Sequence, residues 1–468
     1  MTTLIMKFGG SAVGLNLGLT QMLSIVLHES ERWKKLLIVV SALDGVTDQL
    51  LEATHLAQLS NGRGYRRIVA NLRQRHIALI ESLPLGVTEK KALESDIDQM
   101  LFEMLAVCQA LSDAPENAAP ETIYGIVAVG ERLSARIVAA LLRQNGQRSV
   151  AIDATDLIIT DNVFGNATPN LALTRQRITE SLMPMLERKI IPVITGFIAS
   201  TQTGKITVLG RGGSDYTASI LGVCTDAAEV WIWTDVDGMM TADPHEISTA
   251  HSIPIISYEE AAELAYFGAR ILHPRMIDPL RDRAIPLRVR NVFKPGQPGT
   301  LVQTMASNLA SGIKAVTSIQ GLGITASRSG SLTHVSALVD ETLFRITGSR
   351  ADVMIASQTS SSSFLAFVIP TSAGQSAAHQ LQIEVEHQLE QSDEFAGWSA
   401  RLVNIVTAIG AHLDQQYTIT IEILRRLTDL KLLALSHGPR GCSISLITEV
   451  EDAETVLNRV HDLILTQP

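Results

Sequence analysis

The 468-residue sequence is poor in cysteine, in aromatic residues and in charge. Its three cysteines, Cys108, Cys224 and Cys442, are far apart and form no C-x-x-C pair. This excludes a disulfide framework and a cysteine-based zinc site, and it favours a reducing, cytoplasmic environment. Charged residues make up 18% of the chain, below the usual share of about 25%. The net charge of −10 provides no basic excess to neutralise phosphates, so we expect no nucleic-acid partner.

Long apolar segments are also missing. Residues 1–8 lead directly into a strand pattern and lack the apolar region of a signal peptide. The one long stretch without formal charge, residues 353–383, is rich in Ser, Thr and Gln and contains Pro370, which argues against a membrane span. We therefore expect no membrane association. A chain of this length predicts roughly two to four domains.

What the sequence does contain is an alternation of short apolar strands with longer helical patterns over residues 1–303. The expected strands are Leu4–Phe8, Leu36–Ser41, Ile126–Val129, Ile190–Phe197, Ile206–Leu209, Glu229–Thr234 and Ile285–Val289. The expected helices are Leu19–His28, Glu131–Gln144, Thr217–Leu221, Tyr258–Ile271 and a stretch from Val46 to about Leu111, interrupted near residues 61–64 and Pro84. The alternation predicts an α/β fold, a three-layer sandwich whose mainly parallel central sheet is covered on both faces. Ligands of such sheets bind beyond the carboxyl ends of the strands.

A weak internal repeat follows the turn-rich segment Pro295–Gly299. Residues 353–368 align without gaps on residues 432–447, which places Phe367 opposite Leu446. Each copy has the pattern of a strand, a polar turn and a second strand, so the repeat predicts two small α/β modules. The predicted domains are therefore residues 1–303, 304–390 and 391–468, with approximate and interleaved limits for the last two.

Glycines follow several of the expected strands, and the first such turn is Lys7-Phe-Gly-Gly10. Amides at Gly9 and Gly10 can approach a phosphate closely because no Cβ intervenes, and Lys7 adds a cation. A strand-end lysine before an ordinary turn would give the same pattern. The sequence has no Walker loop.

The segment Leu209-Gly-Arg-Gly-Gly-Ser-Asp215 is more specific. Three glycines surround Arg211, and Ser214 and Asp215 open an expected helix, so amides and a helix N-terminus together predict an anion site. The planar guanidinium of Arg211 suits a carboxylate. A simple helix cap beside a surface arginine would leave the glycine density unexplained.

Two other segments are ambiguous when taken alone. Thr234-Asp-Val-Asp-Gly238 follows a strand, and a turn explains it equally well. Phe267–Pro274 places Arg270 in a helix that ends at a proline, where a basic residue also suits the helix dipole. His273, beside the proline, is expected to be structural.

Taken together, these segments resemble the aspartate kinase family of the amino-acid kinase superfamily, over the whole chain. The HPRMI segment that begins at His273 resembles the kinase part of bifunctional aspartokinase/homoserine dehydrogenases. The repeated tail resembles the paired, ferredoxin-like ACT modules of the family, one inserted within the other, which bind amino-acid effectors. The matching segments are Lys7–Ser11, Ser41–Thr47, Val129–Ser134, Gly210–Asp215, Thr234–Gly238, Phe267–Pro274 and Gly299–Val302.

The resemblance implies an enzyme that transfers a phosphoryl group from ATP, with Mg²⁺, to the side-chain carboxylate of L-aspartate. The product would be 4-phospho-L-aspartate, in the first step towards lysine, threonine and methionine. The catalytic residues that it implies are Lys7 and Asp215. Those for aspartate are Ser41, Thr47, Glu131, Arg211 and Ser214. Those for the nucleotide are Gly9, Gly10, Ser11, Gly212, Gly213, Thr234, Asp235, Met240, His245 and Arg270.

For regulation, the resemblance implies threonine or lysine as effector, Gln358 as its contact, and a homo-oligomer formed through ACT strand edges. No residue is assigned as a dedicated metal ligand. Departures from the family pattern, at Ala12, Met240, His245 and Arg270, lie mostly on the nucleotide side.

Two alternatives stay open. One is a non-catalytic amino-acid sensor with a vestigial kinase fold, which would predict loss of Lys7, Arg211 or Asp215. The other is a sister enzyme that phosphorylates glutamate or another acid, against which the Glu131 segment and the repeated tail argue.

Overall fold

The computed structural model describes residues 2–268, 272–304, 312–327, 331–370, 373, 376–414 and 417–466. The chain divides into two compact units. Unit 1 comprises Met1–Gly238 and Arg275–Thr304, and unit 2 comprises Met239–Pro274 and Met305–Pro468. This division assigns Met239–Pro274 to the C-terminal unit, whereas the sequence-based limits are contiguous; those limits stay a prediction.

Unit 1 is built on a central sheet in the strand order β3-β5-β2-β1-β8-β10-β11. Every neighbouring pair up to β10 is parallel, and β11 is antiparallel to β10. The predicted α/β fold with a mainly parallel sheet is thus confirmed. A small second sheet has the order β4-β6-β7. The strands of unit 1 are β1 (Thr3–Phe8), β2 (Lys35–Val40), β3 (Ser149–Ile152), β4 (Ile159–Thr160), β5 (Ile191–Thr195), β6 (Ile198–Thr201), β7 (Ile206–Val208), β8 (Glu229–Thr234), β10 (Leu287–Asn291) and β11 (Thr300–Gln303).

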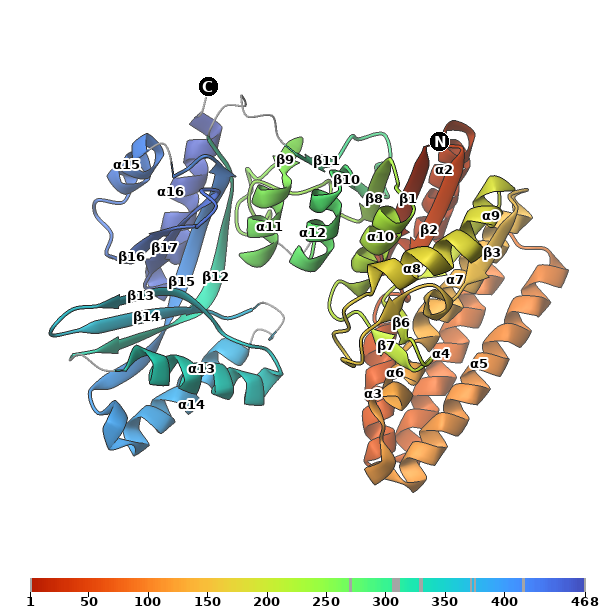
Figure 1. The fold of residues 1–468 in the computed structure, drawn as a ribbon, viewed down its shortest axis with the longest axis horizontal. Coiled ribbons are helices and arrows are strands. Elements are labelled where there is room, and N and C mark those ends of the chain that lie inside the picture. Colours follow the sequence, from red (N-terminus) through yellow and green to blue (C-terminus); the bar gives the residue numbers. More distant parts are fainter. Residues whose placement is uncertain are drawn as a thin grey trace. The chain divides into compact units, whose positions relative to one another are not determined.

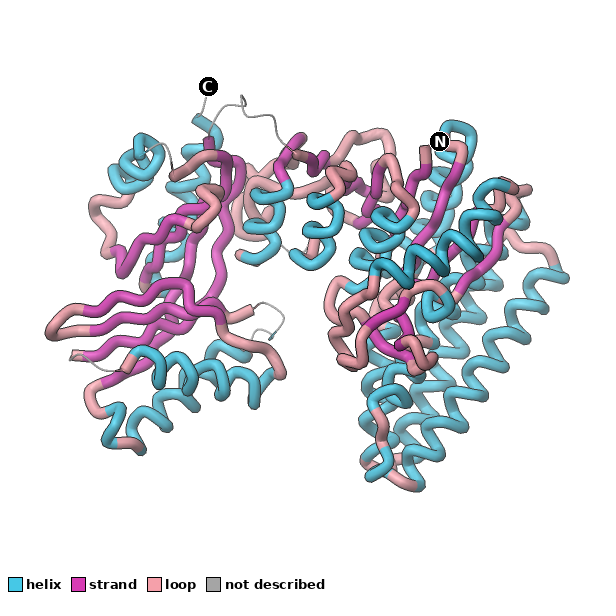
Figure 2. The backbone as a smooth tube through the Cα atoms, in the orientation of Figure 1, coloured by secondary structure: helices cyan, strands magenta, loops and turns pink. Residues whose placement is uncertain are grey.

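Helices form the outer layers of unit 1 (Figures 1 and 2). Helices α2 and α7 lie over one face of the sheet, with the long helices α3 to α5 beside α7, and α9 and α10 lie over the other face. The helices of unit 1 are α1 (Gly10–Val13), α2 (Asn16–Arg32), α3 (Val46–Gln58), α4 (Gly62–Ser82), α5 (Val87–Asp113), α6 (Pro120–Val127), α7 (Val129–Gln144), α8 (Leu171–Arg177), α9 (Met183–Glu187), α10 (Gly213–Cys224) and α12 (Pro274–Asp282).

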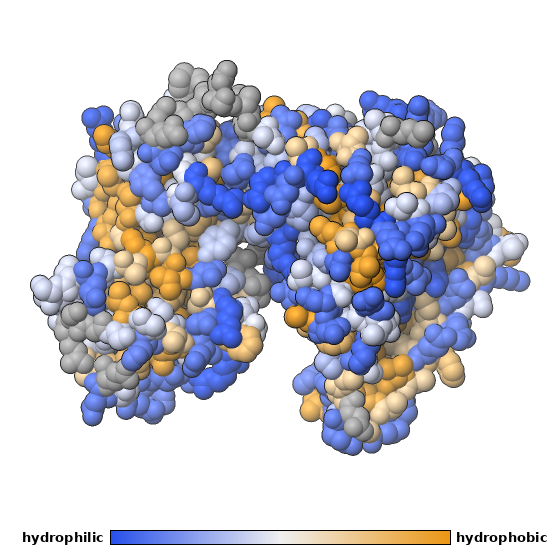
Figure 3. Space-filling model, viewed as in Figure 1, coloured by the Kyte–Doolittle hydropathy of each residue, from blue (hydrophilic) through white to orange (hydrophobic). Residues whose placement is uncertain are grey.

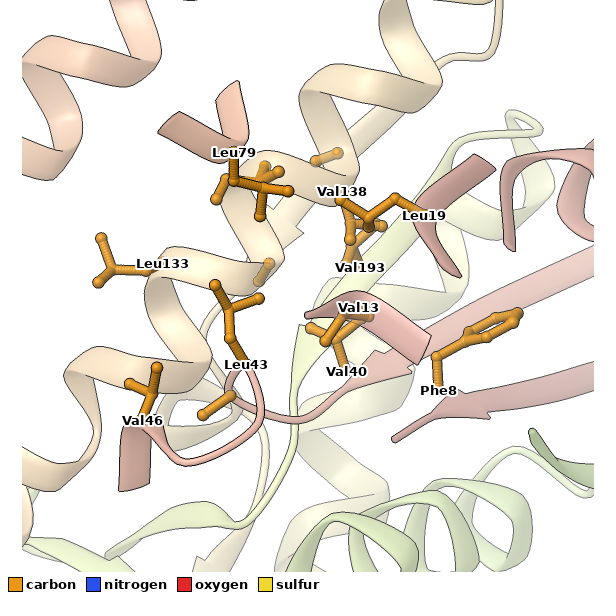
Figure 4. Close-up of a cluster of buried hydrophobic side chains, with 14 of the residues drawn as sticks. Phe8, Val13, Leu19, Val40, Leu43, Val46, Leu79, Leu133, Val138 and Val193 are labelled. Atoms are coloured by element: carbon orange, nitrogen blue, oxygen red, sulfur yellow. The ribbon is translucent and has the colours of Figure 1, made fainter. Parts of the chain in front are cut away.

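Side chains alternate along β1, so alternate residues of this strand point to opposite faces of the sheet. Leu4, Met6 and Phe8 join the hydrophobic core under α2 and α7. Figure 4 shows this core, in which Phe8 and Val40 from the sheet lie with side chains of the surrounding helices. Lys7 has the opposite parity, so its side chain points to the face that α10 covers.

The expected strand Ile126–Val129 is wrong, because these residues are helical. Pro120 opens α6, which ends at Val127, and α7 begins at Val129. A short apolar run does not distinguish a buried strand from a buried helix. Here the run is apolar because Ile126–Val129 lies at the junction of the two helices, where all four residues are buried.

Unit 2 contains an antiparallel sheet in the order β13-β14-β12-β15-β17-β16. Its two long central strands, β12 and β15, each contribute to two separate hydrophobic cores, one under α13 and α14 and one under α15 and α16. The two halves therefore share their central strands. The elements of unit 2 are β9 (Ile255–Ser257), α11 (Tyr258–Tyr266), β12 (Gly312–Ala326), α13 (Leu332–Thr347), β13 (Asp352–Gln358), β14 (Ser363–Val368), α14 (Ala377–Gln391), β15 (Trp398–Ala411), α15 (Tyr417–Arg426), β16 (Leu432–His437), β17 (Ser443–Thr448) and α16 (Ala453–Thr466).

The internal repeat corresponds to two β-hairpins, β13–β14 and β16–β17, but the gapless alignment is two residues out of register in the second strand. Gln358 pairs with Ser363, whereas His437 pairs with Ile444, so the second hairpin has the longer turn. A shift of two keeps each side chain on the same face of the sheet, which is why the apolar alternation still matched.

Hydrophilic side chains cover much of the surface, interrupted by apolar patches (Figure 3). Among the described residues, no helix is both long enough and apolar enough to cross a bilayer.

Candidate active site

Four parallel strands of unit 1 end at the same edge of the sheet, and three of them are followed by glycine or serine. The amide after each of these three strands donates to a neighbouring strand: Gly9 to Trp233 O (3.2 Å), Ser41 to Phe8 O (3.2 Å) and Gly196 to Val40 O (2.8 Å). The fourth strand, β8, ends at Thr234. The loops that carry the predicted site therefore begin side by side, beyond the carboxyl ends of the strands.

Lys7 and Asp215 form the most direct contact in this region. Lys7 Nζ lies 2.6 Å from Asp215 Oδ1, and the two side chains are 11% and 13% exposed. Lys7 comes from the end of β1, and Asp215 lies in the first turn of α10, on the sheet face that Lys7 points to. The structure thus brings together the two residues predicted to be catalytic.

The loop before α10 depends on glycine. Gly210 and Gly212 have φ angles of +80° and +68°, a left-handed conformation that favours glycine. Gly213 has an ordinary φ, but a Cβ there would lie 3.1 Å from Phe197 Cα and 2.7 Å from its ring. Ser214 packs just as closely against Gly196. The glycine density thus reflects both backbone conformation and close approach.

Phe197 is a residue that the sequence analysis missed. Its φ is +68°, unusual for a residue with a bulky side chain, and its amide donates to Thr217 Oγ1 at 3.0 Å. Leu209 N donates to Phe197 O at 2.9 Å. The turn after β5 is therefore fixed against the start of α10. Its only sequence signal was a glycine followed by an aromatic residue at a strand end.

Glu131 lies in the first turn of α7 and is 3% exposed. Its Oε1 accepts a hydrogen bond from the amide of Ala42 at 3.2 Å, in the loop after β2. Its buried Oε2 has no hydrogen-bond partner among the described residues. Burial raises the pKa of Glu131 from 4.5 to about 8, although the Ala42 amide acts in the opposite direction.

The loop after β2 also approaches the first glycine turn. A Cβ at Gly10 would lie 3.1 Å from Ala42 O and 3.2 Å from Asp44 N. Ser41 opens this loop, and Thr47 lies in the first turn of α3; both are half-buried. Ser11, in the short helix α1, is also half-buried.

Arg211 differs from the other predicted site residues because it is exposed. No hydrogen bond or ion pair to it occurs within the described part of the chain. Its guanidinium is thus available to a ligand.

Thr234 and Asp235 follow β8, where Thr234 Oγ1 donates to Asp235 Oδ1 at 3.1 Å. A second ion pair that the sequence analysis missed lies beside them. Lys294 Nζ is 2.7 Å from Asp237 Oδ2, and Asn291 Nδ2 donates to Asp237 Oδ1 at 2.6 Å. The hydrogen bond from Lys294 is the main cause that lowers the pKa of Asp237. Asp237 follows β8 and Lys294 follows β10. These strands are parallel neighbours, so an expected adjacency of the two strands could have predicted that their following loops meet.

The remaining predicted residues do not belong to unit 1. Met240 and His245 are in unit 2, where Met240 bridges to Ser252 and the His245 amide donates to Asp243. Gln358 ends β13, is exposed and donates to Ser363 Oγ at 3.2 Å. Arg270 lies outside the described residues. In the described part of the chain, no three His, Cys, Asp or Glu side chains are grouped to hold a metal ion.

The fold is that of an α/β protein whose glycine loops meet at one edge of a mainly parallel sheet, and residues 2–291 match the family described as the amino acid kinase family. The chain belongs to that family. Within it, the chain is similar to the bifunctional aspartokinase/homoserine dehydrogenase of Daucus carota, with 27% identity over 98% of this chain and 50% of the relative. The chain thus spans about half the length of this relative.

Two solved structures are similar over nearly the whole chain. One is E. coli aspartokinase III in complex with aspartate and ADP (R-state), with 25% identity and a TM-score of 0.77. The other is the same enzyme with lysine and aspartate (T-state), with 26% identity and a TM-score of 0.80. Both alignments cover 99% of this chain and 100% of the solved chain. These matches confirm the resemblance to aspartokinases predicted from the sequence.

Proposed function

We propose that the protein is an aspartate kinase that transfers the γ-phosphoryl group of ATP to the side-chain carboxylate of L-aspartate, giving 4-phospho-L-aspartate. The observation that carries the proposal is the buried Glu131, whose Oε2 has no partner in the part of the chain that the structure describes and can receive an ammonium group. The exposed Arg211 can bind the α-carboxylate of the same amino acid. The similarity to a protein crystallised with aspartate and ADP supports this substrate pair.

The reaction needs no general base. The side-chain carboxylate of aspartate has a reference pKa of about 3.9, so it is an ionised nucleophile at neutral pH. The obstacle is repulsion between that carboxylate and the phosphates, which catalysis overcomes by positioning and charge neutralisation. Lys7 is the proposed cation at the transferring phosphoryl group, and Asp215, 2.6 Å away, holds its ammonium in place.

The glycine turns supply amides to the phosphates. Gly9 and Gly10 follow β1, and Gly212 and Gly213 open α10, whose N-terminal amides face the same edge of the sheet. Ser11, Ser41, Thr47 and Ser214 supply hydroxyls in these loops. ATP would bring Mg²⁺ bound to its phosphate oxygens, and we assign no protein ligand to the ion.

Unit 2 is the proposed regulatory part. Its antiparallel sheet with helices suits a pair of ACT modules, and Gln358 at the end of β13 is the proposed effector contact. The similarity to a lysine-bound aspartokinase favours an amino-acid effector, lysine or threonine. Pairing of exposed strand edges would give a homo-oligomer.

Trapping of the acyl phosphate as a hydroxamate tests the proposal. The purified chain is incubated with MgATP, hydroxylamine and either aspartate or glutamate. We expect hydroxamate with aspartate only. Product only with glutamate would identify the sister enzyme, and no product with either would favour the sensor. Adding lysine or threonine to the same assay identifies the effector.

A further inference from the structure

Arg275 lies where the chain returns to unit 1. It is the second residue of α12 and follows the segment Met239–Pro274, which belongs to unit 2. It belongs to the HPRMI segment that resembles aspartokinases, but the sequence assigned it no role in the site. Its guanidinium contacts the loop that carries Arg211, a neighbouring loop and the helix that follows.

The guanidinium of Arg275 binds two backbone carbonyls and one side chain. Nη1 donates to Leu209 O at 3.0 Å, and Nη2 donates to Ala167 O at 3.0 Å. Nη1 also donates to the Oδ1 of Asn166. The guanidinium carbon lies 5.0 Å from the centre of the Tyr216 ring, which is the distance of a cation–π contact.

These contacts enclose the glycine loop from three sides. Leu209 immediately precedes Gly210 and Arg211, and Tyr216 immediately follows Asp215. Asn166 fills the space beside Gly210, because a Cβ at Gly210 would lie 2.5 Å from Asn166 Oδ1. The Arg275 side chain thus connects three parts: Leu209 at the beginning of the glycine loop, Asn166 in the neighbouring loop, and Tyr216 in α10.

The geometry indicates a supporting role and not a substrate contact. Both terminal nitrogens of Arg275 are engaged with protein acceptors, so they are not available to a ligand carboxylate. A lysine could not replace this arrangement, because its single ammonium lacks the planar fork that binds two carbonyls and stacks on a ring.

We propose that Arg275 is a positioning residue of the amino-acid substrate site, which holds the loop Leu209–Gly212 so that Arg211 meets the substrate carboxylate. The inference rests on the proposed function for the identity of that substrate. Arg211 has no protein partner of its own among the described residues. The position of its side chain is therefore set by the backbone of the loop. Movement of the loop should weaken aspartate binding more than ATP binding, because Arg211 is the proposed partner of the substrate α-carboxylate, whereas Gly212 shares the phosphates with Gly9, Gly10 and Gly213.

The test compares Arg275→Lys with Arg175→Lys as a matched control. Arg175 binds the opposite end of the same helix, through Asp226 (2.7 Å) and Val223 O. In the hydroxamate assay, we expect Arg275→Lys to raise the KM for aspartate about ten- to a hundredfold, the scale of losing one or two charge-assisted hydrogen bonds. The KM for ATP should stay within about twofold, and Arg175→Lys should change neither. An aspartate KM within about twofold of wild type, or equal rises of both KM values, would overturn the inference.

A second measurement does not depend on activity. Amide hydrogen exchange reports local opening, so Arg275→Lys should speed exchange at residues 209–213 and leave residues 222–226 unchanged. Arg175→Lys should do the reverse. Unchanged exchange at 209–213 would overturn the inference even if the wild-type chain proved inactive with aspartate, which would refute only the proposed function. If Arg275→Lys does not fold, Asn166→Ala, which removes one acceptor, should show the same pattern to a smaller extent, and normal exchange at 209–213 in that variant would count against the inference.

Discussion

Glu131→Gln tests the proposed ammonium site most directly. The amide side chain has nearly the same volume, and its oxygen can still accept the hydrogen bond from Ala42 N. What the variant loses is the ability to carry a negative charge at Oε2, the atom without a partner among the described residues. We expect binding of aspartate to weaken while the unliganded protein keeps its fold.

The size of the effect follows from burial. The rise of the pKa from 4.5 to about 8 corresponds to roughly 5 kcal/mol by which the protein environment disfavours the ionised carboxylate. A substrate ammonium offsets this cost, so the variant should lose a charge-assisted hydrogen bond worth roughly 1.5–3 kcal/mol. That is about a ten- to a hundredfold rise in the KM for aspartate. The unliganded variant should be at least as stable as the wild type, because a buried, unpaired charge is unfavourable.

The pH dependence gives the sharper result. With a pKa of about 8, Glu131 is about 1% ionised at pH 6, about 9% at pH 7 and about half ionised at pH 8. If aspartate binds the ionised form, its KM should fall about tenfold between pH 6 and 7 and about fivefold more by pH 8. In Glu131→Gln this dependence should be absent.

The folding stability of the unliganded protein should change with pH in the opposite direction to aspartate binding. A carboxyl group whose pKa is raised on folding stabilises the unliganded protein fully below the unfolded value, near 4.5, and this contribution is lost as the pH rises through about 8. The free energy of unfolding of the wild type, measured relative to that of Glu131→Gln, should therefore fall as the pH rises over that range. The assay is KM for aspartate at fixed, saturating MgATP from pH 6 to 8, with thermal unfolding of both proteins alongside. The same KM profile in wild type and variant would refute the assignment.

Three other predictions concern separate contacts. Lys7→Ala should lower kcat at least about a hundredfold, the scale of losing one preorganised charge; a variant with wild-type kcat would remove Lys7 from the mechanism. Arg211→Ala should raise mainly the KM for aspartate and leave the melting temperature unchanged, because the side chain is exposed; an unchanged KM would reassign this residue. Glu260 in unit 2 is fully buried, completes the capping box of α11 with Ser257 and lies 2.8 Å from Lys314. Glu260→Ala should cost about 2–4 kcal/mol of unfolding free energy in urea denaturation, with less loss in Glu260→Gln, and wild-type stability would show that the buried pair contributes nothing.

The sequence predicted the central sheet because parallel strands are apolar along their whole length and end in conspicuous glycine turns. It also predicted which turns meet, since the carboxyl ends of parallel strands lie at one edge. It could not predict Phe197 or the pair Asp237–Lys294, because both depend on how loops pack after their strands end. The helical state of residues 126–129 was missed because this short run is wholly buried and contains no polar residue, so its period cannot be read.

The proposed site combines two opposite electrostatic arrangements, and under the proposed function their difference explains how one edge of a sheet would receive both substrates. Lys7 already has a counter-ion in Asp215, so its ammonium is held in place at little electrostatic cost before substrate arrives. Glu131 has no counter-ion among the residues that the structure describes, and burial favours its protonated form until a cation enters. A phosphate alone offers no such cation, and so gains nothing from Glu131. An amino acid offers an ammonium group, so only the zwitterion brings a negatively charged nucleophile beside Lys7 and satisfies the buried carboxylate at the same time.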